Sequence, residues 1–489
     1  MTTTRQVRSY IETDGVRWPG CHLQRVTGRE SIGELFTFTI EVAADLHGDL
    51  ADTAVPGQRA TLVFQREGLD VRRVHGAIVR VALRFEQEGE RCVYRIELAP
   101  RAQQLALVEA QEVYLDRSVP DILRDKLELH GFTDDDFELR LGSSYPQRDF
   151  VVQYGETDLA FISRLAEDAG ISLFVEQGET VDRIVFTDWV NGFGERSSSL
   201  PLAYVGQAEE EGVYDLEIET GLIPGSFYVR DYNYRNPLLE PLGVHHLEGE
   251  TAGGVVDYGA HVRTPEEATA LATIRAEERH CRKVVHRAVA TSLELSAGLR
   301  IHIAHCPALD GSRPLLIERV EHDLAAAVDG PSEEPNFVYR ARITAVAGDA
   351  PYRPVRRAPR PKMPAVVTGI VQPDPAGVVG GHAILSDDGR YWVQLHFDTY
   401  KEPLQKASAP IRMAQPFAGY GNGMHFPLVP GTEVLIAFAN GDPDRPVILA
   451  AVPNRVSPSP VTAADSNQNR IRTNAGIVIE FGAVETPIT

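Results

Sequence analysis

The sequence predicts a mainly β protein with inserted helices. Short apolar runs that alternate with polar residues, divided by turn signals, occupy both ends of the chain. Amphipathic helical segments with capping signals are few and fall between these runs. A length of 489 residues allows about two to four domains. We therefore expect several β domains and one α/β insertion.

The stretch from Met363 to Asn454 is the densest in strand and turn signals. Strands are expected at Arg390–Asp398, Ile411–Phe417 and Glu433–Phe438. The run Gly441–Pro446 then forces a tight turn, because each proline fixes φ and removes a backbone donor. Short strands at this spacing, with no helix between them, predict a small closed barrel of the OB type.

The N-terminal part of the chain also reads as strands. Short β runs divided by polar turns are expected at Leu35–Val42, Ala60–Phe64, Gly76–Leu83 and Arg91–Leu98. We interpret the first 115 or so residues as a barrel. Strands are expected again from Tyr204 to about residue 347.

Three helices interrupt these strands. Val119–Gly131 has proline early and glycine at its end, and Thr157–Gly170 carries an apolar stripe before the strand Ser172–Glu176. Thr264 and Glu267 flank a proline and form a capping box, from which a helix is expected to run to about Cys281.

Residues 349–362 mark a domain boundary. They hold four prolines and five basic residues. Proline at this density blocks helix and favours an extended spacer. The basic residues could hold an acidic neighbour, but a solvated linker is the interpretation we favour.

Long, ordered motifs carry a family resemblance. The run from Arg390 through Ile411–Gly419 to Gly441–Ile448 closely resembles the OB domain of VgrG proteins. These are the spike proteins of bacterial type VI secretion and are related to the hub and spike of contractile phage tails. The segment Val152–Ile171 resembles the matching part of the VgrG hub. The implied domains are a first hub β-barrel (1–115), an α/β insertion (116–200), a second hub β-barrel (201–348), the Pro/Arg linker (349–362), an OB-fold β-barrel domain (363–455) and the start of a trimeric β-helix needle, truncated or short (456–489).

The resemblance also implies a function. It predicts a non-enzymatic, homotrimeric hub and spike at the tip of a type VI contractile injection machine, which punctures target envelopes and carries effectors. The implied partners are copies of the chain itself, the inner-tube protein beneath the hub, baseplate components, and a tip protein or effector at the needle end. The alternative is the spike of a phage tail or of an extracellular contractile particle. No cofactor is implied.

Composition limits the other classes of function. The net charge of −21 argues against a nucleic-acid partner, and the OB segment holds six Lys and Arg against eight Asp and Glu. The sequence contains no run of eighteen apolar residues, so it predicts no membrane-spanning helix. The first ten residues lack the apolar core of a signal peptide. We expect assembly in the cytoplasm and export by injection. The four cysteines are expected to be buried and reduced.

Candidate metal and phosphate sites are weak. The spacing of His302, His305 and Cys306 could suit zinc, but residues three apart on a strand face opposite sides. The glycines of Gly419–Gly423 lack the helix and lysine of a phosphate loop and are interpreted as a turn. Other histidines fall nearby in the sequence: His245, His246, His280, His286 and His322. We expect no metal ligand and no catalytic residue.

The C-terminal strand carries the one predicted site. Ile477, Ile479 and Phe481 alternate with Val478 and Glu480, so one face of the strand is apolar. The resemblance gives this strand to the start of the needle. We expect the strand to lack a partner within its own chain, and these three side chains to form a trimer interface around the three-fold axis.

Overall fold

The computed structural model describes residues 7–18, 21–45, 55–85, 91–196, 201–205, 211–250, 252–326, 337–372, 385–398 and 408–481. The chain divides into two compact units. The first unit holds Met1–Val108, Leu123–Tyr145 and Asp158–Pro359, and the second holds Glu109–Ile122, Pro146–Thr157 and Arg360–Thr489. The boundaries of the six predicted domains do not coincide with this division, since residues 109–122 and 146–157 belong to the second unit; the six domains stay predictions.

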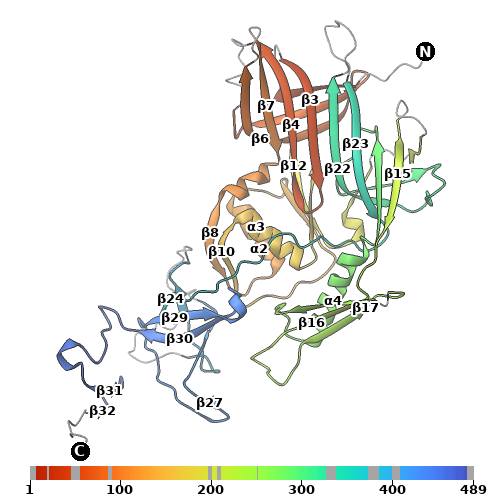
Figure 1. Cartoon of the computed structure of the whole chain (residues 1–489). Helices are drawn as coiled ribbons and strands as arrows, with labels where there is room; N and C mark the ends of the chain where they lie inside the picture. The colour runs from red at the N-terminus through yellow and green to blue at the C-terminus, as the bar shows by residue number, and fades with distance from the viewer. Residues whose placement is uncertain are drawn as a thin grey trace, which may run out of the picture. The chain divides into compact units, whose positions relative to one another are not determined.

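One large, mostly antiparallel sheet is the framework of the first unit (Figure 1). Its strands are β1 (Val7–Thr13), β2 (Val16–Arg17), β3 (Cys21–Ser31), β4 (Glu34–Asp45), β5 (Arg59–Arg66), β6 (Leu69–Phe85), β7 (Arg91–Ala99), β13 (Gly194–Glu195), β15 (Val213–Thr220), β19 (Val284–Ala290), β20 (Leu299–Ile301), β22 (Leu315–Ala326) and β23 (Phe337–Ala347). Hydrogen-bonded neighbours follow the order β13-β20-β22-β3-β4-β7-β6-β5-β1-β23-β19-β15, with β2 on β1. Because β22 also pairs with β23, the path from β22 through β3 and β1 returns on itself.

Alternation along the strands builds the core of this sheet. Phe38 and Ile40 are fully buried on β4, whereas Thr37 between Phe36 and Phe38 is exposed. The β period of two puts alternate side chains on one face, and that face buries the apolar set. The four strands predicted before residue 99 are confirmed as parts of β4, β5, β6 and β7.

An α/β element belongs to the first unit as well. The sheet β11-β12-β9 consists of β11 (Ser172–Gln177), β12 (Asp182–Thr187) and β9 (Phe137–Arg140). The predicted helices are confirmed as α2 (Val119–Leu129) and α3 (Asp158–Asp168), which are followed by glycines at positive φ, Gly131 and Gly170. On α2, Ile122, Leu123 and Leu127 are fully buried, whereas Leu129 is 63% exposed.

A second helix-on-sheet element follows. The sheet β17-β16-β18 is formed by β16 (Ser226–Arg230), β17 (Leu242–His246) and β18 (Gly254–Tyr258), and α4 (Pro265–His280) packs on β16 and β17 (Figure 1). The predicted cap is confirmed, because Thr264 Oγ1 accepts from Glu267 N and the Glu267 carboxylate accepts from Arg263 N. The first unit also holds η1 (Arg101–Leu107), η2 (Val190–Gly192) and the short pair β14 (Leu202–Ala203) and β21 (Ile303–Ala304).

The proline-rich segment is not a solvated spacer over its first half. Tyr352 is 2% exposed and packs with Phe193 at 5.6 Å between ring centroids. Arg353 donates to Glu277 Oε2 over 2.7 Å and to the carbonyl oxygen of Asp188 over 2.8 Å. The backbone nitrogens of Arg357 and Ala358 both donate to the Glu167 carboxylate, at 2.7 and 2.9 Å. The basic residues therefore tie this segment to acidic groups of the first unit.

The second unit is centred on a five-stranded sheet with the order β25-β24-β29-β30-β26. Its strands are β24 (Val367–Val371), β25 (Val393–Leu395), β26 (Arg412–Met413), β29 (Glu433–Phe438) and β30 (Pro446–Val452). Of the predicted strands, β29 has the expected bounds, whereas β25 and β26 are much shorter. Pro410 and Pro416 flank β26, and proline cannot donate to a ladder. Tyr391, Val393 and Leu395, which alternate along this segment, are buried on one face.

A hairpin from earlier in the chain completes the core of the second unit. β8 (Glu109–Tyr114) pairs with β10 (Val151–Thr157). Phe150 and Val152 belong to the same buried cluster as Tyr391 and Ile436. The turn after β29 includes η3 (Ala439–Gly441), and η4 (Ala463–Asp465) follows β30.

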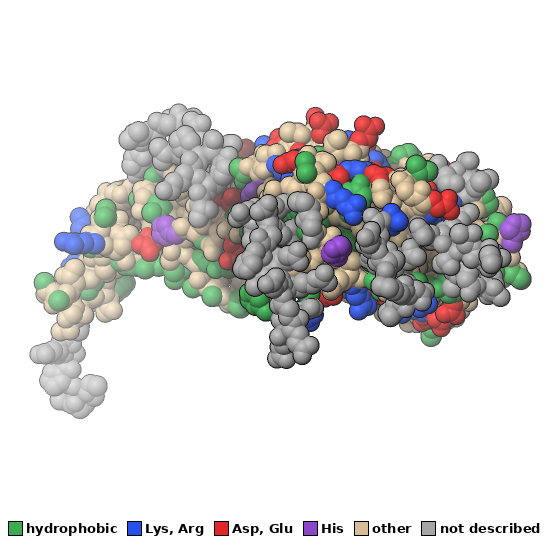
Figure 2. All heavy atoms as spheres, turned by 90° about the horizontal axis from the view of Figure 1, so that it is seen from above, with side chains coloured by type: hydrophobic (Ala, Val, Ile, Leu, Met, Phe, Trp, Pro, Cys, Tyr) green, Lys and Arg blue, Asp and Glu red, His purple; other side chains and the backbone are tan. Residues whose placement is uncertain are grey.

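The molecule is thus mainly β with inserted helices, as predicted. Within the described ranges, none of the helices has the length and apolar character that crossing a membrane requires. Cys92, Cys281 and Cys306 are buried as expected, but Cys21 is only half-buried. The face in Figure 2 shows acidic and basic side chains interspersed.

Candidate functional site

The three residues predicted from the sequence lie on a C-terminal hairpin. β31 (Asn469–Arg472) pairs antiparallel with β32 (Val478–Phe481), and Ile471 lies opposite Ile479. Our expectation of a terminal strand without a partner in its own chain is therefore wrong. The strands turn through Gly476, at φ 86°, whose amide donates to Thr473 O.

The apolar face of this hairpin is open. Ile477, Ile479 and Phe481 are 62%, 47% and 61% exposed, and Ile471 adds a fourth apolar side chain, 41% exposed. A two-stranded hairpin is marginally stable by itself in water. The single chain leaves uncovered the face that we predicted to be an interface.

The polar side of the hairpin is satisfied internally. Arg470 Nε donates to Glu480 Oε1 over 2.5 Å, and its Nη1 donates to Asp465 Oδ2 over 2.6 Å. The amide of Thr462 also donates to Asp465, and these hydrogen bonds hold the pKa of Asp465 below its usual value. Asp465, Arg470 and Glu480 therefore pair with one another on the side of the hairpin opposite Ile471 and Ile479.

The glycine-rich run forms a second exposed hairpin. β27 (Ala418–Gly419) pairs with β28 (Asn422–Gly423) around Tyr420 and Gly421, the latter at φ 69°. Every residue from Pro416 to Pro427 is exposed. We predicted only a turn here and missed the surface. The signal was available, because no Asp, Glu, Lys or Arg occurs between Arg412 and Glu433.

A buried polar cluster lies inside the large sheet. Glu30 pairs with Arg72, and His322 Nε2 lies 3.0 Å from Glu30 Oε1. His322 Nδ1 lies 2.6 Å from Tyr339 Oη, and its ring stacks on Phe38 at 5.3 Å. Burial raises the pKa of Glu30, but the charge of Arg72 and the bond to His322 outweigh it and lower that pKa to about 2. The pKa of His322 is lowered, mainly by burial.

A second buried ion pair joins two helices. Lys126 of α2 lies 2.8 Å from Asp158 Oδ1 of α3, and both side chains are 1% exposed. His130 Nε2 lies 2.6 Å from the other carboxylate oxygen. Removing one member of such a pair leaves a buried charge, so we read both clusters as parts of the framework.

The zinc candidates do not come together in the described part of the chain. His302 Nδ1 lies 3.2 Å from Gly311 O, and His305 follows β21 at φ 62°, outside a strand. His322 lies on β22, whereas His305 lies outside the strands.

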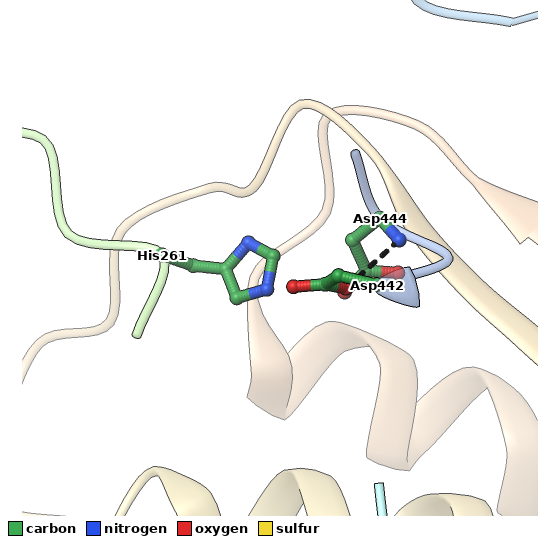
Figure 3. Close-up of side chains that lie close together, drawn as sticks. All are labelled: His261, Asp442 and Asp444. Atoms are coloured by element: carbon green, nitrogen blue, oxygen red, sulfur yellow. Dashed lines mark hydrogen bonds between the residues drawn. The ribbon is translucent and has the colours of Figure 1, made fainter. Parts of the chain in front are cut away.

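Two aspartates meet in the turn of the second unit. Asp444 N donates to Asp442 Oδ1 over 3.1 Å (Figure 3), and Asp444 Oδ1 accepts from Val152 N over 2.7 Å. His261, drawn beside them, belongs to the first unit, so we assign the three residues no common metal site.

Family models match most of the chain. Residues 29–328 match the phage tail baseplate hub (GPD). Residues 365–452 match the type VI secretion system/phage-baseplate injector OB domain. The first match lies within the range of the large sheet and its insertions, and the second covers the five-stranded sheet.

Individual proteins give the same picture. The chain is 27% identical over 448 residues to the type VI secretion system spike protein VgrG1c of Pseudomonas aeruginosa, covering 88% of this chain and 60% of that protein. It is 26% identical over 479 residues to the actin cross-linking toxin VgrG1 of Vibrio cholerae, covering 92% of this chain and 42% of the toxin. The chain thus spans less than two thirds of either relative.

A solved structure shares the fold. The E. coli c3393 protein is a component of the type VI secretion system with structural similarity to the T4 bacteriophage tail proteins gp27 and gp5. It superposes with a TM-score of 0.64 at 24% identity, covering 90% of this chain and 99% of that one. At this identity the likeness shows the fold alone.

Proposed function

Since the chain belongs to the phage tail baseplate hub (GPD) family, we propose that it is the hub and spike of a contractile injection machine of the type VI secretion kind. Its work is mechanical. It caps an inner tube, is driven through a target envelope, and carries an effector. We propose assembly in the cytoplasm followed by injection.

One observation carries this proposal. The hub match at 29–328 is followed in the same chain by the injector OB match at 365–452. The alignment with the spike protein VgrG1c covers 88% of this chain, so it extends beyond the hub match. We further propose that the large sheet contains two barrel-like halves.

The acting form is a homotrimer. Three copies of the terminal hairpin each bring Ile477, Ile479 and Phe481 to one axis, where these exposed side chains become buried. Burial of each is worth roughly 1.5–3 kcal/mol. Three-fold contacts are heterologous and close into a ring. Residues 456–489 would then begin a β-helical needle.

The other partners follow from this placement. We propose the inner-tube protein beneath the hub, baseplate components around it, and a tip protein or effector at the needle end. The alternative is the spike of a phage tail or of an extracellular contractile particle, which uses the same mechanics. Neighbouring genes for a sheath ATPase or for a capsid would separate these two.

We propose no catalytic activity for the chain. This chain covers 42% of the length of the actin cross-linking toxin VgrG1. We therefore do not assign the toxin's activity to this chain. Assays of the purified chain on peptidoglycan, lipid and nucleic acid are expected to show no turnover. Reproducible turnover that one point substitution abolishes would contradict this.

The mass in solution tests the proposal directly. Light scattering at micromolar concentration is expected to give three times the chain mass of 53.8 kDa. A single chain mass would overturn the trimeric spike.

A further inference from the structure

The hairpin from Pro416 to Pro427, here called the aromatic hairpin, is an unusual surface for this chain. Its exposed large side chains are Phe417 (54%), Tyr420 (104%), Met424 (44%) and Phe426 (48%). No charged residue lies between Arg412 and Glu433, although 24% of the chain is Asp, Glu, Lys or Arg. Contiguous exposed apolar patches on soluble proteins mark interaction sites.

The protein holds this hairpin in a fixed shape. Tyr391 is fully buried, and its Oη accepts from Leu428 N over 3.1 Å and lies 3.1 Å from His425 Nε2. His425 Nδ1 lies 3.1 Å from Gln415 Nε2, across the base of the hairpin. Met424 N donates to Phe417 O over 3.2 Å. A protrusion anchored in this way loses little conformational freedom when it binds.

The chemistry of the hairpin limits its partner. Nucleic acid and anionic lipid are both held by Lys and Arg, and the hairpin has neither. A partner that recognises charged side chains would have none to contact on the aromatic hairpin. Obligate contacts between subunits are instead apolar and depleted in charge.

The chain itself offers a matching second surface. Leu449, Ala450 and Ala451 of β30 are exposed, and no charged residue occurs between Arg445 and Arg455. A closed ring needs two different surfaces on each copy. Copies that each carry a net charge of −21 repel one another, and contact through two uncharged surfaces adds no local repulsion.

We propose that the aromatic hairpin docks on a second copy of this chain, against the exposed segment Leu449–Ala451 of β30. The contact lies in the second unit, separate from the terminal hairpin. It rests on the homotrimer proposed above and adds to it a second interface, ahead of the needle in sequence.

Hydrogen exchange on the full, unsubstituted chain tests the contact. Amides of residues 417–426 are expected to exchange at least tenfold more slowly at a concentration where light scattering gives a trimer than after dilution to monomer. If the chain is trimeric and these amides stay unprotected, the hairpin contact is wrong and the trimer stands. If the chain is monomeric at every concentration, both proposals fall.

A pair of matched variants supplies the second test. Phe417→Asp with Met424→Asp is expected to raise the concentration for half-trimerisation at least tenfold. The control pair, Leu222→Asp with Leu238→Asp, adds the same charge at apolar residues of the first unit that are 85% and 97% exposed. This pair is expected to leave the concentration for half-trimerisation unchanged. Unchanged circular dichroism would confirm that the hairpin variant stays folded. Equal effects of both pairs, or protection seen only with phosphatidylcholine vesicles, would overturn the proposal.

Discussion

The hydroxyl of Tyr352 donates a hydrogen bond of 2.9 Å to Glu318 Oε1, which ties the proline-rich segment to β22. Arg282 Nη2 donates to the same hydroxyl over 2.7 Å, and its guanidinium lies 4.8 Å from the centre of the Tyr352 ring. Burial, together with the Glu318 charge, raises the pKa of Tyr352 well above its usual value. The phenol therefore stays protonated and bridges a cation and an anion inside the first unit.

Removing this hydroxyl is the first prediction. Tyr352→Phe keeps the ring contact with Phe193 but leaves Arg282 without one acceptor. The free energy of unfolding of the first unit is expected to fall by about 1–2 kcal/mol, measured by denaturant titration. Tyr232→Phe, at a ring that is 53% exposed, is the control and is expected to change little. Equal effects of the two would refute the bridging role.

A glycine makes room for the stacked rings of the buried cluster. A Cβ at Gly28 would overlap the Phe38 ring, and Phe38 stacks on His322. Gly28→Ala is expected to destabilise the first unit by about 1–3 kcal/mol through overpacking. Gly221→Ala, where a Cβ meets nothing within 4 Å, is the matched control. Thermal melts of both variants would decide.

The same cluster predicts loss of stability in acid. Glu30 has a pKa of about 2 in the folded chain against 4.5 ordinarily. The ionised Glu30 contributes fully to the free energy of unfolding above about pH 4.5, and this contribution is lost as the pH falls toward 2. The folded pKa of His322 is also lowered, from 6.5, so the unfolded chain binds that proton first. Stability is therefore expected to fall below about pH 6.5, and more steeply below 4.5.

Substitution of His322 checks the sign of this dependence. Urea unfolding of the His322→Gln variant is expected to show a flatter pH profile between pH 7 and 5 than the natural chain. His246→Gln, at an exposed histidine, should leave the profile as it was. A natural chain that gains stability on acidification from pH 7 to 5 would contradict the prediction.

The terminal hairpin gives the fourth prediction. Ile479→Asp places three carboxylates near the proposed axis, where like charges and lost burial act together. The segment from Ser457 onward is expected to become sensitive to protease while the rest of the chain stays folded. Val478→Asp is the control, because Val478 and Ile479 are both 47% exposed and adjacent strand residues face opposite sides. Resistance of the Ile479→Asp variant would mean that Ile479 does not face the axis.

Sequence patterns predicted those elements whose signal is local. Glu433–Phe438 was predicted with its observed bounds because a continuous apolar run lies between turn residues. The N-cap of α4 was predicted equally well, since Thr264 and Glu267 are three residues apart; the Glu267 carboxylate, however, accepts from Arg263 N and not from Thr264 N. The open apolar face of Ile477, Ile479 and Phe481 followed from the period of a strand.

Features that depend on distant partners were missed. The prolines and arginines of residues 349–362 look the same in sequence whether the segment is a free spacer or is bound to the protein. The groups that bind it, Glu277 and Glu167, come from the distant helices α4 and α3. The pairing of β32 with β31 needed the turn at Gly476 to be recognised. The hydrogen-bond partners of His322 lie on two other strands, so the residues next to it in the sequence did not indicate that it is buried.

The pairing of β3 with β22 governs when the chain is able to fold. Glu30 and His322 are hydrogen-bonded across that pairing although 292 positions separate them in the sequence. A ribosome adding about 5–20 residues per second needs roughly 15–60 seconds to pass from one to the other. Throughout that time one edge of β3 lacks its strand, and unpaired edges invite association with other chains. The edge of β3 therefore stays open to other chains until β22 emerges from the ribosome.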